Sequence, residues 1–255
     1  MVFHICAFLF LGMILGSFAT AVAHREMQGA AWWVFNPNMS EARSQCPQCH
    51  HNLKILDLIP VLSWLFSRGR CRYCQSPIPK FYIIIELVSS IACLLVFVFM
   101  GLSLESFLVS LSIPFLIALT VIDIKQKILP DRLVIILGVL GCLVLASKQI
   151  NGLDSTLIWE HALGGLIFPG LLWLLGAFMS YALKRKTLGL GDVKFFAVAG
   201  LWLGLSLLPY FMIISGLFGI VLGLLWRFYH KDPIFPFGPA LVLSFSCVLL
   251  WQGFL

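Results

Sequence analysis

The stretch Leu188–Phe196 reads LGLGDVKFF and places one carboxylate, Asp192, directly behind two glycines, Gly189 and Gly191. It lies where a basic segment, residues 184–186, gives way to a long apolar run. A carboxylate at the edge of a membrane is costly unless it is solvated, paired or used in chemistry. Glycine leaves the backbone bare, so that another chain can approach closely. The stretch therefore marks both a membrane boundary and a candidate site.

The composition around this stretch is that of a membrane protein. Of the 255 residues, 60% are hydrophobic and 11% are charged, and the mean hydropathy is +1.00. Soluble domains carry about 25% charged residues. We therefore predict an all-α, polytopic integral membrane protein in contact with the lipid bilayer. The net charge of +6 does not require nucleic acid, because basic residues gather in the cytoplasmic loops of membrane proteins. We expect no nucleic-acid partner.

Apolar runs predict about eight transmembrane helices, each close to the roughly 20 residues that a spanning helix needs. The runs cover residues 2–23, 81–101, 105–123, 132–147, 157–180, 193–208, 209–229 and 234–255. No basic residue precedes the first run, so we interpret it as an uncleaved span and not as a signal peptide. Its Gly16-Ser17 pair suits close helix packing. The run at 193–208 is short, and its end at Pro209 is the least defined boundary.

The basic residues predict the orientation of these spans. If residues 24–80 face the cytosol, 16 of the 17 basic residues lie on the cytosolic side, and only Lys148 lies outside. Positive charge concentrates on the cytoplasmic side of membrane proteins. We therefore expect a multi-pass protein with a periplasmic N-terminus, and with Asp192 and residues 24–80 facing the cytosol.

Three regions follow from this layout: a first helix (1–23), a loop-rich cytosolic subdomain (24–80) and a membrane domain (81–255). The subdomain is the one long polar stretch and contains five prolines. Within it, the apolar run Leu58–Phe66 is too short to span, and we expect it at the membrane surface.

Two carboxylates are expected at the cytosolic face. Asp123 ends the third predicted span and Asp192 begins the sixth, so the two could meet in space. Asp192 could instead cap its helix, since Asp is a favoured N-cap. Asp123 could instead pair with Lys125 or Lys127. It lies at a helix C-terminus, where the dipole disfavours a negative charge.

A facing pair of carboxylates would favour acid–base hydrolysis. One ionised Asp takes a proton from water, and the other, protonated, donates to the carbonyl oxygen. Like charges held close together share a proton and titrate as a unit. A third carboxylate, Asp131, follows a proline and precedes an apolar run, and is expected to cap the fourth span.

Four cysteines form a second motif, in two CxxC pairs: Cys46 with Cys49, and Cys71 with Cys74. The spacing is close to that of zinc-ribbon sites, in which four thiolates fill a tetrahedral, structural zinc site. Two disulfides are the alternative, and a reducing cytosol disfavours them. The neighbouring His50 and His51 are interpreted as surface residues.

Glu86 is the remaining charge of interest. It lies about one and a half turns inside the second predicted span. It either reaches solvent at the interface or faces a polar cavity.

Together these features resemble the type IV prepilin leader peptidases over most of the chain. The segments that carry the resemblance are Gly16–Phe18, Cys46–Cys49, Ile59–Leu65 (IPVLSWL), Arg68–Cys74, Glu86, Ile122-Asp123 with Leu129–Asp131, Gly189–Lys194 (GLGDVK) and Phe235–Pro239 (FPFGP). GxGD alone is a weak signature. The GxGD motif becomes a specific signature when the double CxxC motif and the upstream Asp precede it in this order.

The resemblance implies an aspartic endopeptidase of the bacterial inner membrane. Such enzymes cleave the leader peptide of type IV prepilins or type II secretion pseudopilins after a glycine, at the cytosolic face. Asp123 and Asp192 would be catalytic, and Cys46, Cys49, Cys71 and Cys74 would hold Zn²⁺. Gly189, Gly191, Lys194 and Glu86 would support the active site.

The resemblance also implies N-methylation of the new N-terminal residue with S-adenosylmethionine, through the region at 24–80. Here the chain departs from the family, with Ala19-Thr20 in place of Leu-Asn and Leu58 where a second Asn is usual. Methyl transfer is therefore left open.

Two functions of other classes remain as alternatives. A proton-coupled transporter would use its carboxylates to carry ions, and it would need charge deep in the spans. A non-catalytic assembly factor would dock partners through the zinc loop, and its two Asp residues would be dispensable.

Overall fold

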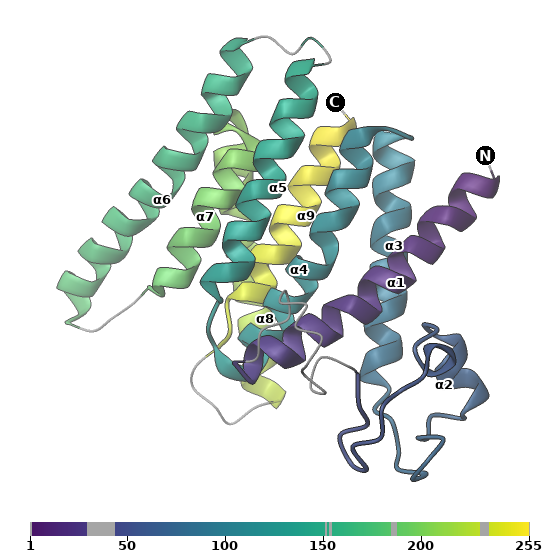
Figure 1. The fold of residues 1–255 in the computed structure, drawn as a ribbon. Helices are drawn as coiled ribbons and strands as arrows, with labels where there is room; N and C mark the ends of the chain where they lie inside the picture. The colour runs from purple at the N-terminus through teal and green to yellow at the C-terminus, as the bar shows by residue number, and fades with distance from the viewer. Residues whose placement is uncertain are drawn as a thin grey trace.

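The computed structural model describes residues 2–29, 44–150, 152, 155–184, 188–229 and 235–254. In these ranges the chain is helical, with two isolated β-bridges in residues 44–80, which are called the cysteine subdomain below. This confirms the predicted all-α fold (Figure 1). The elements are α1 Val2–Met27, η2 Ile55–Asp57, α2 Leu62–Phe66, α3 Phe81–Met100, α4 Leu104–Gln126, α5 Asp131–Ile150, α6 Ser155–Leu183, α7 Leu190–Leu203, η3 Leu205–Leu207, α8 Leu208–Tyr229 and α9 Gly238–Phe254.

The long helices coincide with the eight predicted apolar runs. Six of them, α1, α3, α4, α5, α6 and α8, are long and apolar enough to cross a membrane. The other two are shorter, with 14 residues in α7 and 17 in α9. The chain is thus a multi-pass membrane protein, while a full count of eight crossings stays a prediction.

One predicted boundary is wrong. The break between the sixth and seventh runs falls at Gly204 and not at Pro209. Gly204 has a φ of 75°, a left-handed conformation that glycine adopts without steric cost, and it caps α7. Pro209 lies in the first turn of α8, where a missing backbone N–H costs little.

The helix ends sort to two sides of the bundle (Figure 1). The C-terminal ends of α1, α4 and α6 and the N-terminal ends of α7 and α9 lie at the same end as the cysteine subdomain, and both chain termini lie towards the opposite end. Asp123 and Asp192 therefore belong to one end. Some predicted cytosolic basic residues lie outside the described residues: Arg43, Arg185, Lys186 and Lys231.

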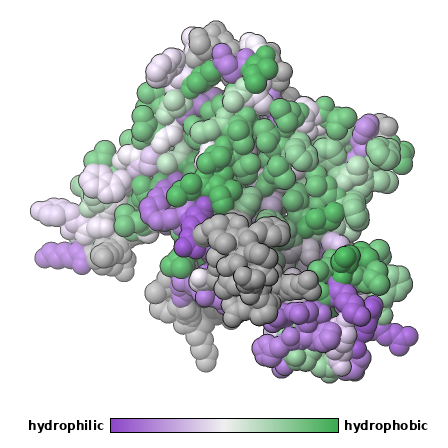
Figure 2. Space-filling model, in the orientation of Figure 1, coloured by the Kyte–Doolittle hydropathy of each residue, from purple (hydrophilic) through white to green (hydrophobic). Residues whose placement is uncertain are grey.

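Helix α4 is the centre of the bundle. It packs against α1, α3, α5 and α9, and it has the largest buried fraction of the six candidate spans. Helices α1 and α3 pack with their backbones close together, because a Cβ added at Gly16 would lie only 2.7 Å from the Cα of Glu86. The predicted use of the Gly16-Ser17 pair in close packing is confirmed. Around this core the bundle presents a broadly apolar surface (Figure 2).

Candidate active site

Asp123 lies in the last turn of α4 and is 5% exposed. Its Oδ2 accepts a hydrogen bond of 2.7 Å from the backbone N–H of Gly238, the first residue of α9. The N-terminus of a helix carries a partial positive charge and free N–H groups, so α9 directs both at this carboxylate. Of the two lysines considered as partners, Lys125 instead places its ammonium 5.8 Å from the centre of the Phe81 ring.

Asp192 is the third residue of α7, and the N-cap of that helix is Gly189. The alternative that Asp192 is the N-cap of its helix is therefore wrong. Its carboxylate instead turns back to a hydrogen bond with the backbone of Gly189, inside the first turn. The carboxylate is close enough to Asp123 for the two charges to interact. The structure thus brings together the two aspartates that lie 69 positions apart in the sequence.

The start of α7 is held in place by the segment between α4 and α5. A Cβ added at Gly191 would lie 3.0 Å from the Cβ of Leu129, so glycine lets α7 approach this segment closely. Lys194 Nζ donates to Asp131 Oδ1 at 2.7 Å, and α5 begins at Asp131. The pair is about half exposed, so it contributes little energy, but it shows that α7 and the start of α5 lie side by side.

Gly238 is a residue of the site to which the sequence assigned no role. A Cβ there would lie 2.7 Å from Asp123 Oδ2, so only glycine fits while its N–H donates to the carboxylate. The signal was present, because Gly238 belongs to the segment FPFGP that carries part of the family resemblance. The spacing alone did not show which carboxylate it would meet.

Glu86 links the transmembrane helix α3 to two other parts of the chain. Its Oε2 accepts a hydrogen bond of 2.7 Å from the backbone N–H of Val61, in the cysteine subdomain, and it also interacts with the Ser17 side chain of α1. Glu86 was expected either to reach solvent at the interface or to face a polar cavity; the structure instead shows it half-buried, in contact with Val61 and Ser17.

The four cysteines of the double CxxC motif come together. Their sulfur atoms all lie within 4.8 Å of one another, and Cys46 Sγ is 3.9 Å from Cys74 Sγ. Sulfurs around a tetrahedral zinc lie about 3.8 Å apart, given Zn–S bonds of about 2.3 Å. All four are free thiols, which argues against the disulfide alternative. The four sulfur atoms therefore fit a metal ion of this type.

Two similar turns build this cluster. In each, the backbone N–H of the residue after the second cysteine donates to the carbonyl of the first: His50 to Cys46, and Gln75 to Cys71, both at 2.9 Å. Both of these residues have a positive φ, 53° and 60°. The ring of the neighbouring His51 packs 3.7 Å from that of Tyr73 and does not join the cluster.

The thiols of the cluster differ in acidity. Burial opposes ionisation of Cys46, but the N–H groups of Cys49 and Gln48 outweigh it and lower the pKa of Cys46 to about 6. The pKa of Cys49 is raised to about 11: the N–H of His51 lowers it, but burial and the neighbouring thiols outweigh that effect. Because thiolates are the metal ligands, a bound cation would have to displace the proton of Cys49.

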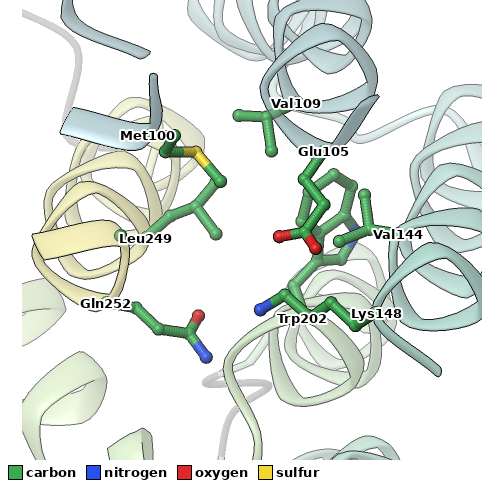
Figure 3. A pocket seen from close by; sticks show the side chains of 9 residues that line it. Met100, Glu105, Val109, Val144, Lys148, Trp202, Leu249 and Gln252 are labelled. Carbon is green, nitrogen blue, oxygen red and sulfur yellow. The ribbon is translucent and has the colours of Figure 1, made fainter. Parts of the chain in front are cut away.

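Two cavities are described, and neither is lined by the aspartates. One, of about 210 Å³, lies at the opposite end of the bundle, where Glu105, Lys148 and Gln252 point into it (Figure 3). Glu105 is in the first turn of α4, whereas Asp123 is in the last. The other, of about 240 Å³, is apolar and is lined by residues of α8 and by Ile124, Phe235, Pro236 and Pro239.

Comparison with known proteins places these features in a family. Residues 10–100 match the model of the bacterial peptidase A24 N-terminal domain, and residues 110–224 match that of the type IV leader peptidase family. No solved structure shows a significant match.

Several curated relatives are similar over nearly their whole length. A prepilin leader peptidase/N-methyltransferase of Aeromonas hydrophila is 33% identical, over 96% of this chain and 89% of the relative. One of Pectobacterium carotovorum is 34% identical, over 96% and 92%. A type 4 prepilin-like proteins leader peptide-processing enzyme of Escherichia coli O78:H11 is 33% identical, over 95% and 92%. On these matches, the chain belongs to the type IV leader peptidase family.

Proposed function

We propose that this chain is a membrane aspartic endopeptidase that cleaves the leader peptide of type IV prepilins or type II secretion pseudopilins. The observation that carries the proposal is that Asp123 and Asp192 lie at one end of the bundle, within electrostatic range of each other. The names of the relatives, which are leader peptidases, support the substrate. A transporter is less well supported, because both carboxylates lie at helix ends and not deep in a span.

The chemistry follows from two carboxylates that share one proton. The ionised member takes a proton from water as the water attacks the scissile carbonyl, and the protonated member donates to the carbonyl oxygen. The hydrogen bond from Gly238 holds Oδ2 of Asp123, and in this proposal the other oxygen, Oδ1, is the one that meets water or substrate. The membrane edge suits this reaction, because water is at hand while the substrate's apolar segment stays in lipid.

The orientation supports access from the cytosol. With the cysteine subdomain in the cytosol, the basic helix ends of the bundle lie on the same side, as the positive-inside rule requires. The N-terminus would then be periplasmic, and the aspartate pair would meet the substrate at the cytosolic face. We keep the division into 1–23, 24–80 and 81–255 as a proposal.

Mass spectrometry of a prepilin co-expressed with this chain tests the proposal. We expect a mature product that begins directly after a glycine, and the same spectrum reports a methyl group on the new N-terminus. An unprocessed prepilin beside well-expressed, membrane-inserted protein would reject the peptidase function.

Among the described residues, neither of the two cavities offers a site for methyl transfer. The apolar cavity beside Ile124 and α8 offers no carboxylate or amide to hold the ribose and amino-acid parts of S-adenosylmethionine, and the cavity with Glu105 lies at the end of the bundle opposite the cysteine subdomain. The described cavities do not fit this cofactor, so we derive no step through it.

We further propose that Cys46, Cys49, Cys71 and Cys74 hold one structural Zn²⁺. A site with four thiolates leaves no open position for a substrate, so the ion would fold the subdomain and take no part in the reaction. Replacing Cys71 with Ser is expected to lower the zinc content from about one ion per chain to near zero.

Elemental analysis of purified protein checks this, together with protease sensitivity of residues 44–80, which should rise. Cys142→Ser is the matched control, because Cys142 is an exposed thiol of α5 outside the cluster. Full zinc content in Cys71→Ser would contradict the site.

A second prediction concerns Gly191. A valine there would place a β-branched side chain where the Cβ alone lies 3.0 Å from Leu129, and the start of α7 would have to move. We expect Gly191→Val to slow prepilin cleavage by about 100-fold, since a displacement of about 1 Å at a catalytic group has this cost. Membrane insertion should be unchanged. The measurement compares the prepilin cleavage rates of Gly191→Val and the unmodified protein at equal protein levels. A fully active variant would show that the close approach of Gly191 to Leu129 is dispensable.

A further inference from the structure

The cysteine subdomain carries exposed apolar side chains that its own core does not use. In η2 and α2 these are Ile55, Leu56, Leu62, Leu65 and Phe66, with exposed fractions of 84%, 61%, 48%, 55% and 81%. Large apolar residues grouped on a surface mark a contact with a protein or a membrane. The question is what covers this face.

The inner side of α2 is already occupied. The Trp64 ring packs on the backbone of Gly69, where a Cβ would lie 2.6 Å from the ring, and Trp64 Nε1 donates to the carbonyl of Ile78 at 3.3 Å. Because Trp64 fixes which side of α2 points inward, Leu62, Leu65 and Phe66 are left on the outside. Their exposure follows from this packing.

The bond between Glu86 and Val61 fixes the depth of α2. Helix α3 has 20 residues, and at about 1.5 Å per residue it matches the roughly 30 Å of a bilayer's hydrocarbon core. Glu86 is its sixth residue, so it lies about 7.5 Å inside the start of α3. The Val61 N–H is 2.7 Å from its carboxylate, and α2 begins at the next residue. Helix α2 therefore lies level with the first turns of a membrane-spanning helix.

The backbone at this contact is strained. Val61 has a φ of 61° and a ψ of −52°, and the Leu62 N–H donates to the carbonyl of Pro60 at 2.6 Å, which forms a γ-turn. A β-branched residue is rarely found with a positive φ, and such strain persists only when the surroundings impose it. The hydrogen bond from Val61 to Glu86 is such a constraint.

The surroundings of the face match a bilayer interface. Lys54 directly precedes η2, and Arg68 lies two residues after the end of α2. Both side chains are exposed, and lysine and arginine near a membrane surface are attracted to anionic lipid headgroups. Phe81 and Tyr82, also exposed, begin α3 where interfacial aromatic residues are common. Figure 2 shows an apolar patch over α2 on the side of the membrane helices and hydrophilic residues on the side turned away.

We propose that η2 and α2 form an interfacial anchor, whose apolar face lies in the boundary between lipid headgroups and acyl chains. Glu86 is the positioning residue that holds the anchor at this depth through the Val61 N–H. The cysteine subdomain is then fixed against the bilayer next to α1 and α3, and does not move freely in the cytosol. The inference stands on geometry alone and does not depend on the peptidase function.

Photo-crosslinking in lipid vesicles tests the anchor. The full chain carries p-benzoylphenylalanine at Phe66, in vesicles of phosphatidylethanolamine and phosphatidylglycerol, and adducts are identified by mass spectrometry. The matched control places the same group at Gln48, an exposed residue of the first CxxC turn. We expect at least about fivefold more lipid adduct at Phe66. Equal lipid adducts at the two positions, or adducts at Phe66 mainly to protein, would overturn the proposal.

The role of Glu86 is tested in the same assay. Glu86→Leu removes the acceptor for the Val61 N–H, whereas Glu86→Gln keeps a carbonyl oxygen in its place. We expect Glu86→Leu to lower the lipid adduct at Phe66 at least about threefold, and Glu86→Gln to retain it. Zinc content, measured in parallel, should stay equal in both, which shows an intact subdomain. An unchanged adduct in Glu86→Leu would refute the tether.

Discussion

Replacing Asp192 with Asn is expected to abolish cleavage of a co-expressed prepilin, and Asp123→Asn is expected to do the same. Asparagine keeps the size of the side chain but can neither take a proton from water nor share one with its partner. General acid–base groups contribute factors of about 10² to 10⁴ to a rate, and here each variant removes one half of a pair that acts as a unit. We therefore expect a loss of at least about 1,000-fold, measured as processed prepilin at equal enzyme level.

Glu105→Gln is the matched control for this pair of variants. It makes the same change from acid to amide on the helix that carries Asp123, but at the opposite end of the bundle. Its cleavage rate should stay within about twofold of the unmodified protein, because Glu105 is partly exposed and far from the aspartates, and glutamine has nearly the same size. Full processing by either Asn variant would refute the catalytic pair and favour the assembly-factor alternative.

Replacing Gly238 with Ala is expected to lower the cleavage rate by at least about 100-fold while the protein stays folded. The added Cβ would lie 2.7 Å from Oδ2 and 2.9 Å from Cβ and Cγ of Asp123. Either the carboxylate or the start of α9 must move, and the hydrogen bond from the Gly238 N–H cannot keep its geometry. A misplacement of about 1 Å at a catalytic group is enough for this loss.

Gly216→Ala is the control for this substitution. Gly216 lies in α8, and a Cβ added there meets nothing within 4 Å. This variant should cleave at the normal rate. Both proteins are compared by size-exclusion chromatography in detergent and by zinc content, so that a folding defect is distinguished from a displaced Asp123. A Gly238→Ala variant with normal activity would show that this contact does not position the carboxylate.

Much of the fold could be read from the sequence because each membrane helix is a local feature. An apolar run of about 20 residues must satisfy its own backbone in lipid, so its length and composition are sufficient to locate it. The runs from residues 81 and 105 correspond closely to α3 and α4. The boundary at Gly204 was missed because proline is a strong break inside a helix but an acceptable residue in its first turn.

The site could be read only in part. Asp123 and Asp192 were assigned to one face from the positions of basic residues, which indicate sidedness but not distance. The cluster of four cysteines was predictable because the ligand types and the CxxC spacing define it locally. Gly238 and the contact from Glu86 to Val61 were not, since each joins segments distant in the chain through a backbone N–H. A backbone N–H has no signature in the residue type.

The sequence by itself determined the class of the molecule, the places of its apolar helices, the double CxxC motif and the two carboxylates at helix ends. Hydrophobicity, charge and ligand spacing are properties of residues that are close together in the chain, so they can be recognised in the sequence alone. Only the tertiary structure decided that LGLGDVKFF starts its helix at Leu190, with Asp192 inside the first turn and within electrostatic range of Asp123. It also decided that α9 directs an N–H at that pair. Helix packing sets both contacts, and packing depends on shapes that meet across the whole bundle.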